Sequence, residues 1–172
     1  MERRLAACLH ADVSGYCRLI AADVESTVVT LTAYRELMSR MVEDHDGRVV
    51  DSAGDSFLAE FPTVTAAVRC AIYIQRELEN QNASLPSERR LELRVGIDLG
   101  NVIVEGGRIY GDCVNIAARV QQGARPGGVC LAGSAYDGID GAIDGALPLR
   151  FEYLGERLVK NIDTPQRVYQ LA

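Results

Sequence analysis

The sequence predicts an α+β fold, a ferredoxin-like split βαβ sandwich in which an antiparallel-rich sheet carries helices on one face. Two observations predict this class. Segments with strand and helix patterns alternate in the order strand, helix, two strands, helix, two strands, helix. The 172 residues contain no internal repeat and no linker long enough to divide them, so we expect one domain over residues 1–172.

The first elements follow from apolar patterning. Residues 5–11 are almost continuously apolar, which is typical of a strand buried on both faces. Residues 24–45 carry apolar side chains at helical spacing and end at DHDG, which indicates an amphipathic helix. Residues 48–61 predict two strands joined by an SAGD bend. A second helix opens at Pro62-Thr63, and its core-facing residues are Val64, Ala67, Val68, Ala71, Ile74 and Leu78.

The second half changes to a period of two. The inward positions are Leu91, Leu93, Val95 and Ile97, and they alternate with Glu92, Arg94 and Asp98. A Gly100-Asn101 turn predicts a hairpin to the strand VIVE, and GDCVNIAARVQQ is a helix with Asp112 as its N-cap. The remainder predicts a short strand near 129–131, a Gly- and Asp-rich loop at 137–145, and closing strands near 150–154 and 167–171.

This topology brings two aspartates together. In a split βαβ sheet the first and third strands are antiparallel neighbours, so Asp12 at the end of one lies beside Asp55 at the start of the other. Adjacent carboxylates repel each other unless a cation lies between them, and Mg²⁺ binds few carboxylates together with waters and substrate phosphates. The alternative is that each aspartate merely caps a turn or a helix.

Bulk composition excludes several partners. The net charge is −6 and Lys and Arg form no stripe, so no nucleic-acid polymer is expected as a partner. No apolar stretch approaches the about 18 residues that span a bilayer, so no membrane segment is expected. The five cysteines show no C-x-x-C pairing, which indicates reduced thiols and a cytoplasmic location.

Three stretches resemble the catalytic domain of class III nucleotidyl cyclases, especially the bacterial, rhizobial-type members. They are HADVSGYCRL at 10–19, SAGDSFLAEF at 52–61 and RIYGDCVNIAAR at 108–119. The resemblance covers essentially the whole chain and implies the nucleotide cyclase fold. It also implies an enzyme, an adenylate or guanylate cyclase that converts ATP or GTP to a 3′,5′-cyclic nucleotide (cAMP or cGMP) and pyrophosphate.

The resemblance implies metal and phosphate ligands. Asp12 and Asp55 match two aspartates that bind two Mg²⁺ or Mn²⁺ ions in each site, and a backbone carbonyl near Val13 is a further ligand. Lys160 matches a phosphate-binding lysine with a register that is loose by a residue or two, and a solvated lysine at a strand edge is the alternative. The other expected phosphate ligands lie at a helix start and are Ser14, Gly15, Tyr16 and Cys17.

Two further residues lie in the helical part of the third stretch. Asn115 and Arg119 are four residues apart and project from one helix face. By the resemblance, the asparagine orients the ribose and the arginine neutralises charge on the phosphate in the transition state. An exposed helix with an ordinary Asn and Arg is the alternative. Family members draw the metal ligands from one subunit and this Asn and Arg from the other, which implies a head-to-tail homodimer with two composite sites.

Two positions depart from the adenylate cyclase pattern. The purine-reading lysine is replaced by Asp51, and its usual acidic partner is replaced by Arg108. A carboxylate that accepts from guanine N1 and N2, with an arginine that donates to O6, is complementary to guanine. Two alternatives stay open: adenine is read through backbone contacts, or the two residues form an interfacial salt bridge that reads no base.

The alternative function is a catalytically weak or silent regulatory domain that dimerises and binds nucleotide. Dinucleotide cyclisation is disfavoured, because SAGDSF does not match the G-G-[DE]-E-F hairpin of diguanylate cyclases. Relatives of this kind are often joined to sensory or helical-repeat domains, for which this chain has no room. We therefore expect either a free-standing catalytic domain in signal transduction or one part of a longer parent.

Overall fold

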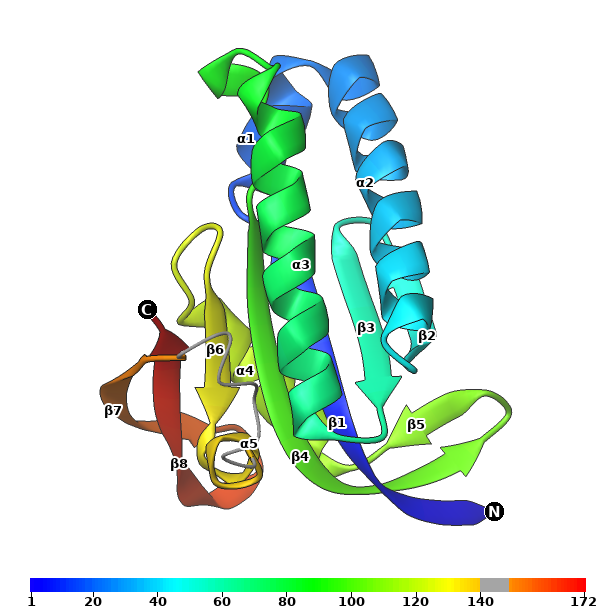
Figure 1. Cartoon of the computed structure of the whole chain (residues 1–172), viewed down its shortest axis with the longest axis vertical. Coiled ribbons are helices and arrows are strands. Elements are labelled where there is room, and N and C mark those ends of the chain that lie inside the picture. The colour runs from blue at the N-terminus through cyan, green and yellow to red at the C-terminus, as the bar shows by residue number, and fades with distance from the viewer. Residues whose placement is uncertain (140–148) are drawn as a thin grey trace.

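The computed structural model describes residues 1–139 and 149–172, which form a mixed sheet covered by helices (Figure 1). In the sheet the strand order is β2-β3-β1-β4-β6-β8-β7, and β5 pairs with the end of β4. β4 and β6 run parallel and the other described pairs are antiparallel, which confirms the antiparallel-rich α+β class. The elements are β1 (Glu2–Val13), α1 (Tyr16–Ala22), α2 (Val24–Asp44), β2 (Arg48–Ala53), β3 (Ser56–Phe61), α3 (Val64–Ala83), the 3₁₀ turn η1 (Ser87–Arg89), β4 (Leu93–Glu105), β5 (Arg108–Tyr110), α4 (Asp112–Gln122), β6 (Val129–Ala132), α5 (Gly133–Asp137), β7 (Phe151–Val159) and β8 (Ile162–Leu171).

Helices cover both faces of the sheet. α2 and α3 pack on one face, against a core that includes Ala7 and Leu9 of β1. The alternate β1 residues Ala6 and Cys8 point the other way, into a second core beneath α4. The expectation of helices on one face therefore holds for α2 and α3, whereas α4 covers the opposite face. The continuous apolar run of β1 at residues 6–9 needs cover on both sides, and both faces of this run are buried.

The predicted helices and the first hairpin occur where the sequence patterns place them. Thr63 caps α3 by accepting a hydrogen bond from the Ala66 N–H at 3.1 Å, and every predicted core position of that helix is buried. In α4 the residue before the helix is Gly111, and Asp112 is its first residue rather than its N-cap. The short elements α1, β5 and α5 give too little periodicity for a sequence pattern to define them.

The predicted Gly100-Asn101 turn is wrong. β4 runs straight through both residues and pairs Ala6 with Gly100 and Leu5 with Asn101. The close packing of α4 on β4 leaves no room for a side chain at position 100, because a Cβ there would lie 2.9 Å from the Cβ of Cys113. The chain reverses later, at Gly106 and Gly107, whose φ angles of 59° and 77° suit a hairpin turn between β4 and β5.

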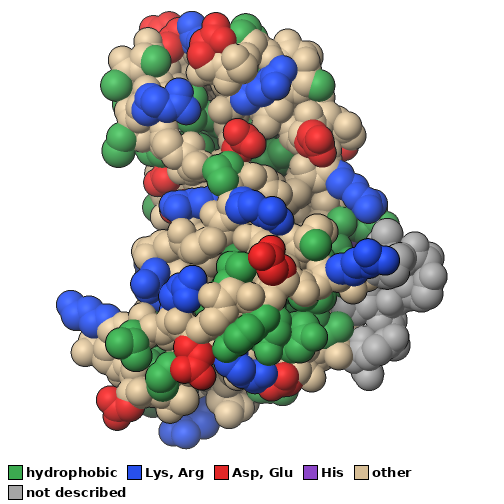
Figure 2. Space-filling model, turned by 90° about the vertical axis from the view of Figure 1, so that its left-hand side faces the viewer, with side chains coloured by type: hydrophobic (Ala, Val, Ile, Leu, Met, Phe, Trp, Pro, Cys, Tyr) green, Lys and Arg blue, Asp and Glu red, His purple; other side chains and the backbone are tan. Residues whose placement is uncertain are grey.

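Three remaining observations concern the predicted loop, the surface charges and the helices. A Gly- and Asp-rich loop is predicted at 137–145, and its residues 140–145 lie outside the described residues. Acidic and basic side chains are intermixed on the face shown in Figure 2. Within residues 1–139 and 149–172, no helix combines the length and the apolar character needed to cross a bilayer.

Candidate active site

Asp12 and Asp55 lie at adjacent strand ends, as the topology predicts. β1 and β3 are antiparallel, and their register pairs Ala11 with Phe57, so the next residues outward are Asp12 on one strand and Ser56 and Asp55 on the other. Both carboxylates act on the imidazole of His10. Burial lowers the pKa of His10, and its hydrogen bond to Gln121 and the charges of the two aspartates oppose that shift. Both carboxylates are therefore near enough to His10 to influence the pKa of its imidazole.

The Asp12 carboxylate has two protein partners that the sequence patterns did not indicate. Arg94 of β4 lies opposite Asp12 in the β1–β4 register and donates from Nε to Oδ1 at 3.2 Å and from Nη2 to Oδ2 at 3.1 Å. Gln121 of α4 donates from Nε2 to Oδ1 at 2.6 Å. Arg94 could have been found from its alternation with the inward-facing residues of β4, which directs it to the face of Asp12. Gln121 carries no comparable signal, because its partner is 109 residues away.

The donor set fits a divalent cation that is shared with a phosphorylated ligand. Among the described residues, no group of three or more His, Cys, Asp and Glu side chains is arranged to hold a metal ion by itself. Two carboxylates with a nearby backbone carbonyl at Val13 are the kind of incomplete oxygen set that Mg²⁺ completes with waters and phosphates. Asp12, Asp55 and Val13 are therefore the residues that would hold the ions. Without a metal ion, the positive charge that contacts the Asp12 carboxylate is the guanidinium of Arg94.

The predicted phosphate loop joins β1 to α1. Gly15 adopts φ 67°, a left-handed conformation that favours glycine, and its carbonyl accepts the first helical bond, from Leu19. The N–H groups of Tyr16 and Cys17 precede that bond and have no helical acceptor, so they are available to an anion. The Ser14 N–H is not available, because it donates to the Glu92 carbonyl at 2.8 Å. Only the hydroxyl of Ser14 can serve the predicted role.

Asn115 and Arg119 occupy the exposed side of α4. Asn115 lines a cavity of about 210 Å³ together with His10 and Asp51. One turn further on, the Arg119 guanidinium donates from Nε to the Leu158 carbonyl at 3.4 Å. Leu158 is two residues before Lys160, which is exposed in the turn between β7 and β8. The helix therefore presents Asn115 toward β2 and β3, and Arg119 toward the turn that carries Lys160.

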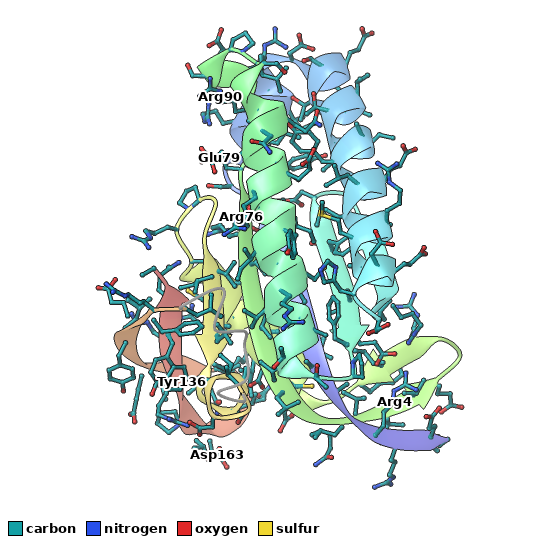
Figure 3. The ribbon with its side chains drawn as sticks, in the orientation of Figure 1. Arg4, Arg76, Glu79, Arg90, Tyr136 and Asp163 are labelled. Atoms are coloured by element: carbon teal, nitrogen blue, oxygen red, sulfur yellow. The ribbon has the colours of Figure 1, made fainter. Side chains whose placement is uncertain are left out.

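Asp51 and Arg108 are both exposed and lie on neighbouring elements. In the described part of the chain no ion pair joins them. Arg48 fixes the hairpin that carries Arg108 by donating to the Gly107 carbonyl at 2.8 Å and to the buried Glu60 at 2.9 Å. Arg4, labelled in Figure 3, is a second partner of Glu60. This network sets the β4–β5 hairpin beside β2 and leaves the charges of Asp51 and Arg108 free for a ligand or for a second subunit.

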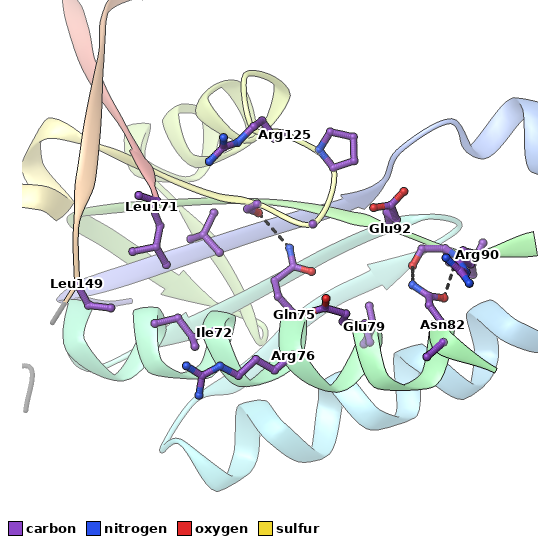
Figure 4. Close-up of a pocket in the computed structure, with 18 of the residues that line it drawn as sticks. Ile72, Gln75, Arg76, Glu79, Asn82, Arg90, Glu92, Arg125, Leu149 and Leu171 are labelled. Carbon is purple, nitrogen blue, oxygen red and sulfur yellow. Dashed lines mark hydrogen bonds between the residues drawn. The ribbon is translucent and has the colours of Figure 1, made fainter. Parts of the chain in front are cut away.

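A larger cavity than the one lined by Asn115 lies elsewhere. It has a volume of about 1030 Å³ and lies on the α3 side of the sheet, where Gln75, Arg76 and Arg125 are among its lining residues (Figure 4). Asn82, at one end, is held by hydrogen bonds to the Leu91 backbone and accepts another from Tyr34. None of the residues predicted for the site lines this cavity. This cavity and the predicted site are therefore formed by different residues.

The chain is similar in sequence to known cyclase domains. A family model described as the adenylate and guanylate cyclase catalytic domain matches residues 4–172. "Putative adenylate cyclase 3" of Rhizobium meliloti (strain 1021) is 40% identical over 170 residues, which are 98% of this chain and 28% of that protein. The chain thus spans little more than a quarter of this relative.

Solved structures show the same architecture. An adenylate/guanylate cyclase/hydrolase from Silicibacter pomeroyi is 36% identical and superposes with a TM-score of 0.86, covering 100% of this chain and 98% of that one. The adenylyl cyclase CyaB from P. aeruginosa superposes with a TM-score of 0.83 over 99% of this chain and 95% of that one. It is 21% identical, and this second likeness concerns the fold alone.

Proposed function

This chain belongs to the adenylate and guanylate cyclase catalytic domain family, and we propose on that premise that it converts a purine nucleoside triphosphate to a 3′,5′-cyclic nucleotide and pyrophosphate. The observation that carries the proposal is the placement of Asp12 and Asp55 at adjacent strand ends. The proposal concerns the catalytic chemistry of residues 1–172.

The chemistry is an intramolecular phosphoryl transfer. The ribose 3′-oxygen forms a bond to the α-phosphorus, the bond from that phosphorus to the bridging oxygen breaks, and pyrophosphate leaves with that oxygen. Asp12, Asp55 and the Val13 carbonyl would hold two Mg²⁺ or Mn²⁺ ions, which when bound lower the pKa of the 3′-hydroxyl and screen the triphosphate charge. No protein nucleophile is needed, so positioning and electrostatic stabilisation supply the catalysis.

The remaining side chains bind and orient the nucleotide. The Tyr16 and Cys17 amides and the Ser14 hydroxyl face the phosphates, and Lys160 supplies a further positive charge. Arg94 exchanges its contact with Asp12 for the phosphate oxygens when substrate arrives. Asn115 orients the ribose. Arg119 donates to the oxygens around the α-phosphorus, where negative charge grows in the transition state.

We propose that the site is completed by a second copy of the chain in a head-to-tail dimer. Asn115 and Asp51 line a cavity that His10 also lines, and neither Asp12 nor Asp55 is among its lining residues. In the dimer each active site takes its aspartates from one subunit and its Asn115, Arg119, Asp51 and Arg108 from the other. Exposed apolar side chains flank the second group: Tyr110 is 56% exposed beside Arg108, and Leu158 is 71% exposed beside Lys160. Contact between subunits would bury them.

The base preference is open between GTP and ATP, and the Asp51–Arg108 pair decides it. A carboxylate and a guanidinium that make no ion pair with each other offer guanine an acceptor for N1 and N2 and a donor for O6. We expect the double variant Asp51→Lys with Arg108→Asp to move the ratio of kcat/KM for GTP over ATP by about 10-fold or more toward ATP. An unchanged ratio in the double variant would remove both residues from base recognition.

The direct test of the proposal is incubation of the purified chain with ATP or GTP and Mn²⁺ or Mg²⁺, with chromatography of the products. Formation of cAMP or cGMP with one equivalent of pyrophosphate supports it. The second candidate, a silent nucleotide-binding domain, is favoured by the exchanged charges at Asp51 and Arg108. Nucleotide binding and dimerisation without any cyclic product would establish that function instead.

The nucleotide substrate and the unpaired cysteines point to a cytoplasmic location.

A further inference from the structure

Gln121 connects the predicted metal site to the interior of α4. It is 1% exposed, and both atoms of its amide are used by side chains of β1 that are two residues apart. Nε2 donates to Asp12 Oδ1 at 2.6 Å, and Oε1 lies 3.1 Å from His10 Nδ1. A buried amide with both ends satisfied has little freedom to rotate.

The neighbouring strand is shaped for this contact. A Cβ at Gly96 of β4 would lie 2.2 Å from the Ala117 carbonyl and 2.7 Å from the Gln121 Cβ. Glycine at position 96 therefore allows the last turn of α4 to rest directly on the sheet backbone. That close approach brings Gln121 within reach of β1.

The direction of the hydrogen bonds follows from the chemistry of the groups. An ionised carboxylate only accepts hydrogen bonds, so the amide nitrogen of Gln121 must face Asp12. The amide oxygen then faces His10, and Nδ1 of His10 must be the protonated nitrogen. The result is a one-way chain of donors from His10 through Gln121 to Asp12.

We infer that Gln121 is a positioning residue that holds the Asp12 carboxylate in the orientation in which it binds a divalent cation, and that His10 fixes the amide of Gln121. This inference rests on the proposed function. Arg94 has to release Asp12 when phosphates arrive, because its guanidinium also suits their oxygens. Gln121 occupies Oδ1 only, has no role toward phosphate, and keeps the carboxylate in place while Oδ2 receives the ion.

The test is Mn²⁺ binding by the intact chain in the presence of a saturating 3′-deoxynucleoside triphosphate, which lacks the attacking hydroxyl. Equilibrium dialysis against the same concentrations of Mn²⁺ and nucleotide gives the Mn²⁺ held by the protein without any turnover, because the Mn²⁺ chelated by free nucleotide is equal on both sides of the membrane. We expect Gln121→Met, which keeps the length and removes both hydrogen bonds, to raise the Kd for Mn²⁺ by about 10- to 100-fold. His10→Phe should raise it less, and the double variant should be no weaker than Gln121→Met, because the two residues act through one chain.

Gln170→Met is the matched control. Gln170 of β8 is also buried, at 2% exposed, and its amide contacts the Arg125 N–H and the Val129 carbonyl, far in sequence from the carboxylates. The Gln170→Met variant should have a lower melting temperature than the wild type, as Gln121→Met should, but an unchanged Kd for Mn²⁺. If Gln121→Met does not fold, His10→Phe alone decides the question.

The failure of this inference is distinct from that of the proposed function. Wild-type chain that takes up no Mn²⁺ with nucleotide overturns the proposed function, and the positioning role with it. Wild-type chain that binds Mn²⁺ with nucleotide, together with unchanged Kd values in the Gln121 and His10 variants, overturns the positioning role alone. A Gln170→Met Kd that rises as much as that of Gln121→Met also overturns it, because general loosening of the fold would then explain both.

Discussion

Asp55→Asn and Arg119→Ala are each expected to lower the turnover number by about 100- to 1,000-fold, and a mixture of the two variants is expected to recover activity. The first variant removes a carboxylate that holds the ions. The second removes the guanidinium that faces the charge of the transition state. If the two groups act in one site but come from different subunits, a dimer of one variant with the other contains one intact site.

The size of the recovery follows from the symmetry. Random pairing makes about half of the dimers mixed, and each of these has one working site of two, so co-expression should give about a quarter of wild-type turnover. A pair of variants from the same half-site, Asp12→Asn with Asp55→Asn, is the control and should recover nothing. Turnover of the purified mixtures, measured as cyclic nucleotide formed, checks both. Equal recovery by both pairs, or by neither, would contradict a composite site.

Asp98→Asn is expected to stabilise the protein by roughly 2–4 kcal/mol at pH 8 and by little at pH 4. Asp98 lies in β4 beneath α4 and is 2% exposed, and its Oδ1 is buried without a hydrogen-bond partner. Burial raises the pKa of Asp98 to about 7, against a smaller opposing effect of a hydrogen bond from the Leu99 backbone. Asparagine has the shape of the protonated acid and never ionises.

The pH dependence has a definite sign. Because the folded-state pKa of Asp98 is above the unfolded value near 3.8, the folded chain binds the extra proton between about pH 4 and pH 7. The free energy of unfolding of the wild type therefore falls as the pH rises through this window and stays low above it. The gain from Asp98→Asn should grow over the same window. Urea unfolding of both proteins at pH 4, 6 and 8 measures it.

Asp163→Asn is the matched control, because Asp163 is exposed at the start of β8 (Figure 3). It should leave the free energy of unfolding within about 0.5 kcal/mol of the wild type at every pH. A gain for Asp98→Asn that is equal at pH 4 and pH 8 would show that packing, and not ionisation, is responsible.

Sequence patterns were sufficient to predict those helices and strands whose apolar residues follow a single clear pattern. The apolar run of β1, the helical spacing of α2 and α3, and the SAGD bend each predict their element, and the strand order they imply places Asp12 beside Asp55. They failed at Gly100-Asn101, where the pair resembles a turn. There the requirement for space beneath Cys113, a contact between residues distant in sequence, keeps the glycine within a strand.

The sequence gives unequal information on the partners of Asp12. The alternation of residues in β4 indicates Arg94, whereas Gln121 meets Asp12 through helix packing and has no local signal. The Ser14 N–H is engaged by the Glu92 carbonyl, a contact between residues far apart in the chain, and this leaves the hydroxyl of Ser14 for the predicted role. Local sequence thus indicates which residues have suitable chemistry, and tertiary packing decides which of their atoms remain free.

The central claim is that Asp12 and Asp55 jointly bind divalent cations above which the triphosphate sits. Crystals grown with Mn²⁺ and a 3′-deoxynucleoside triphosphate, measured at the manganese absorption edge, locate the ions without assumption. We predict two anomalous peaks about 2.0–2.3 Å from carboxylate oxygens of Asp12 and Asp55, with Arg94 turned from Asp12 to the phosphates. Bound nucleotide with no manganese between these two carboxylates, and Arg94 still paired with Asp12, would contradict it.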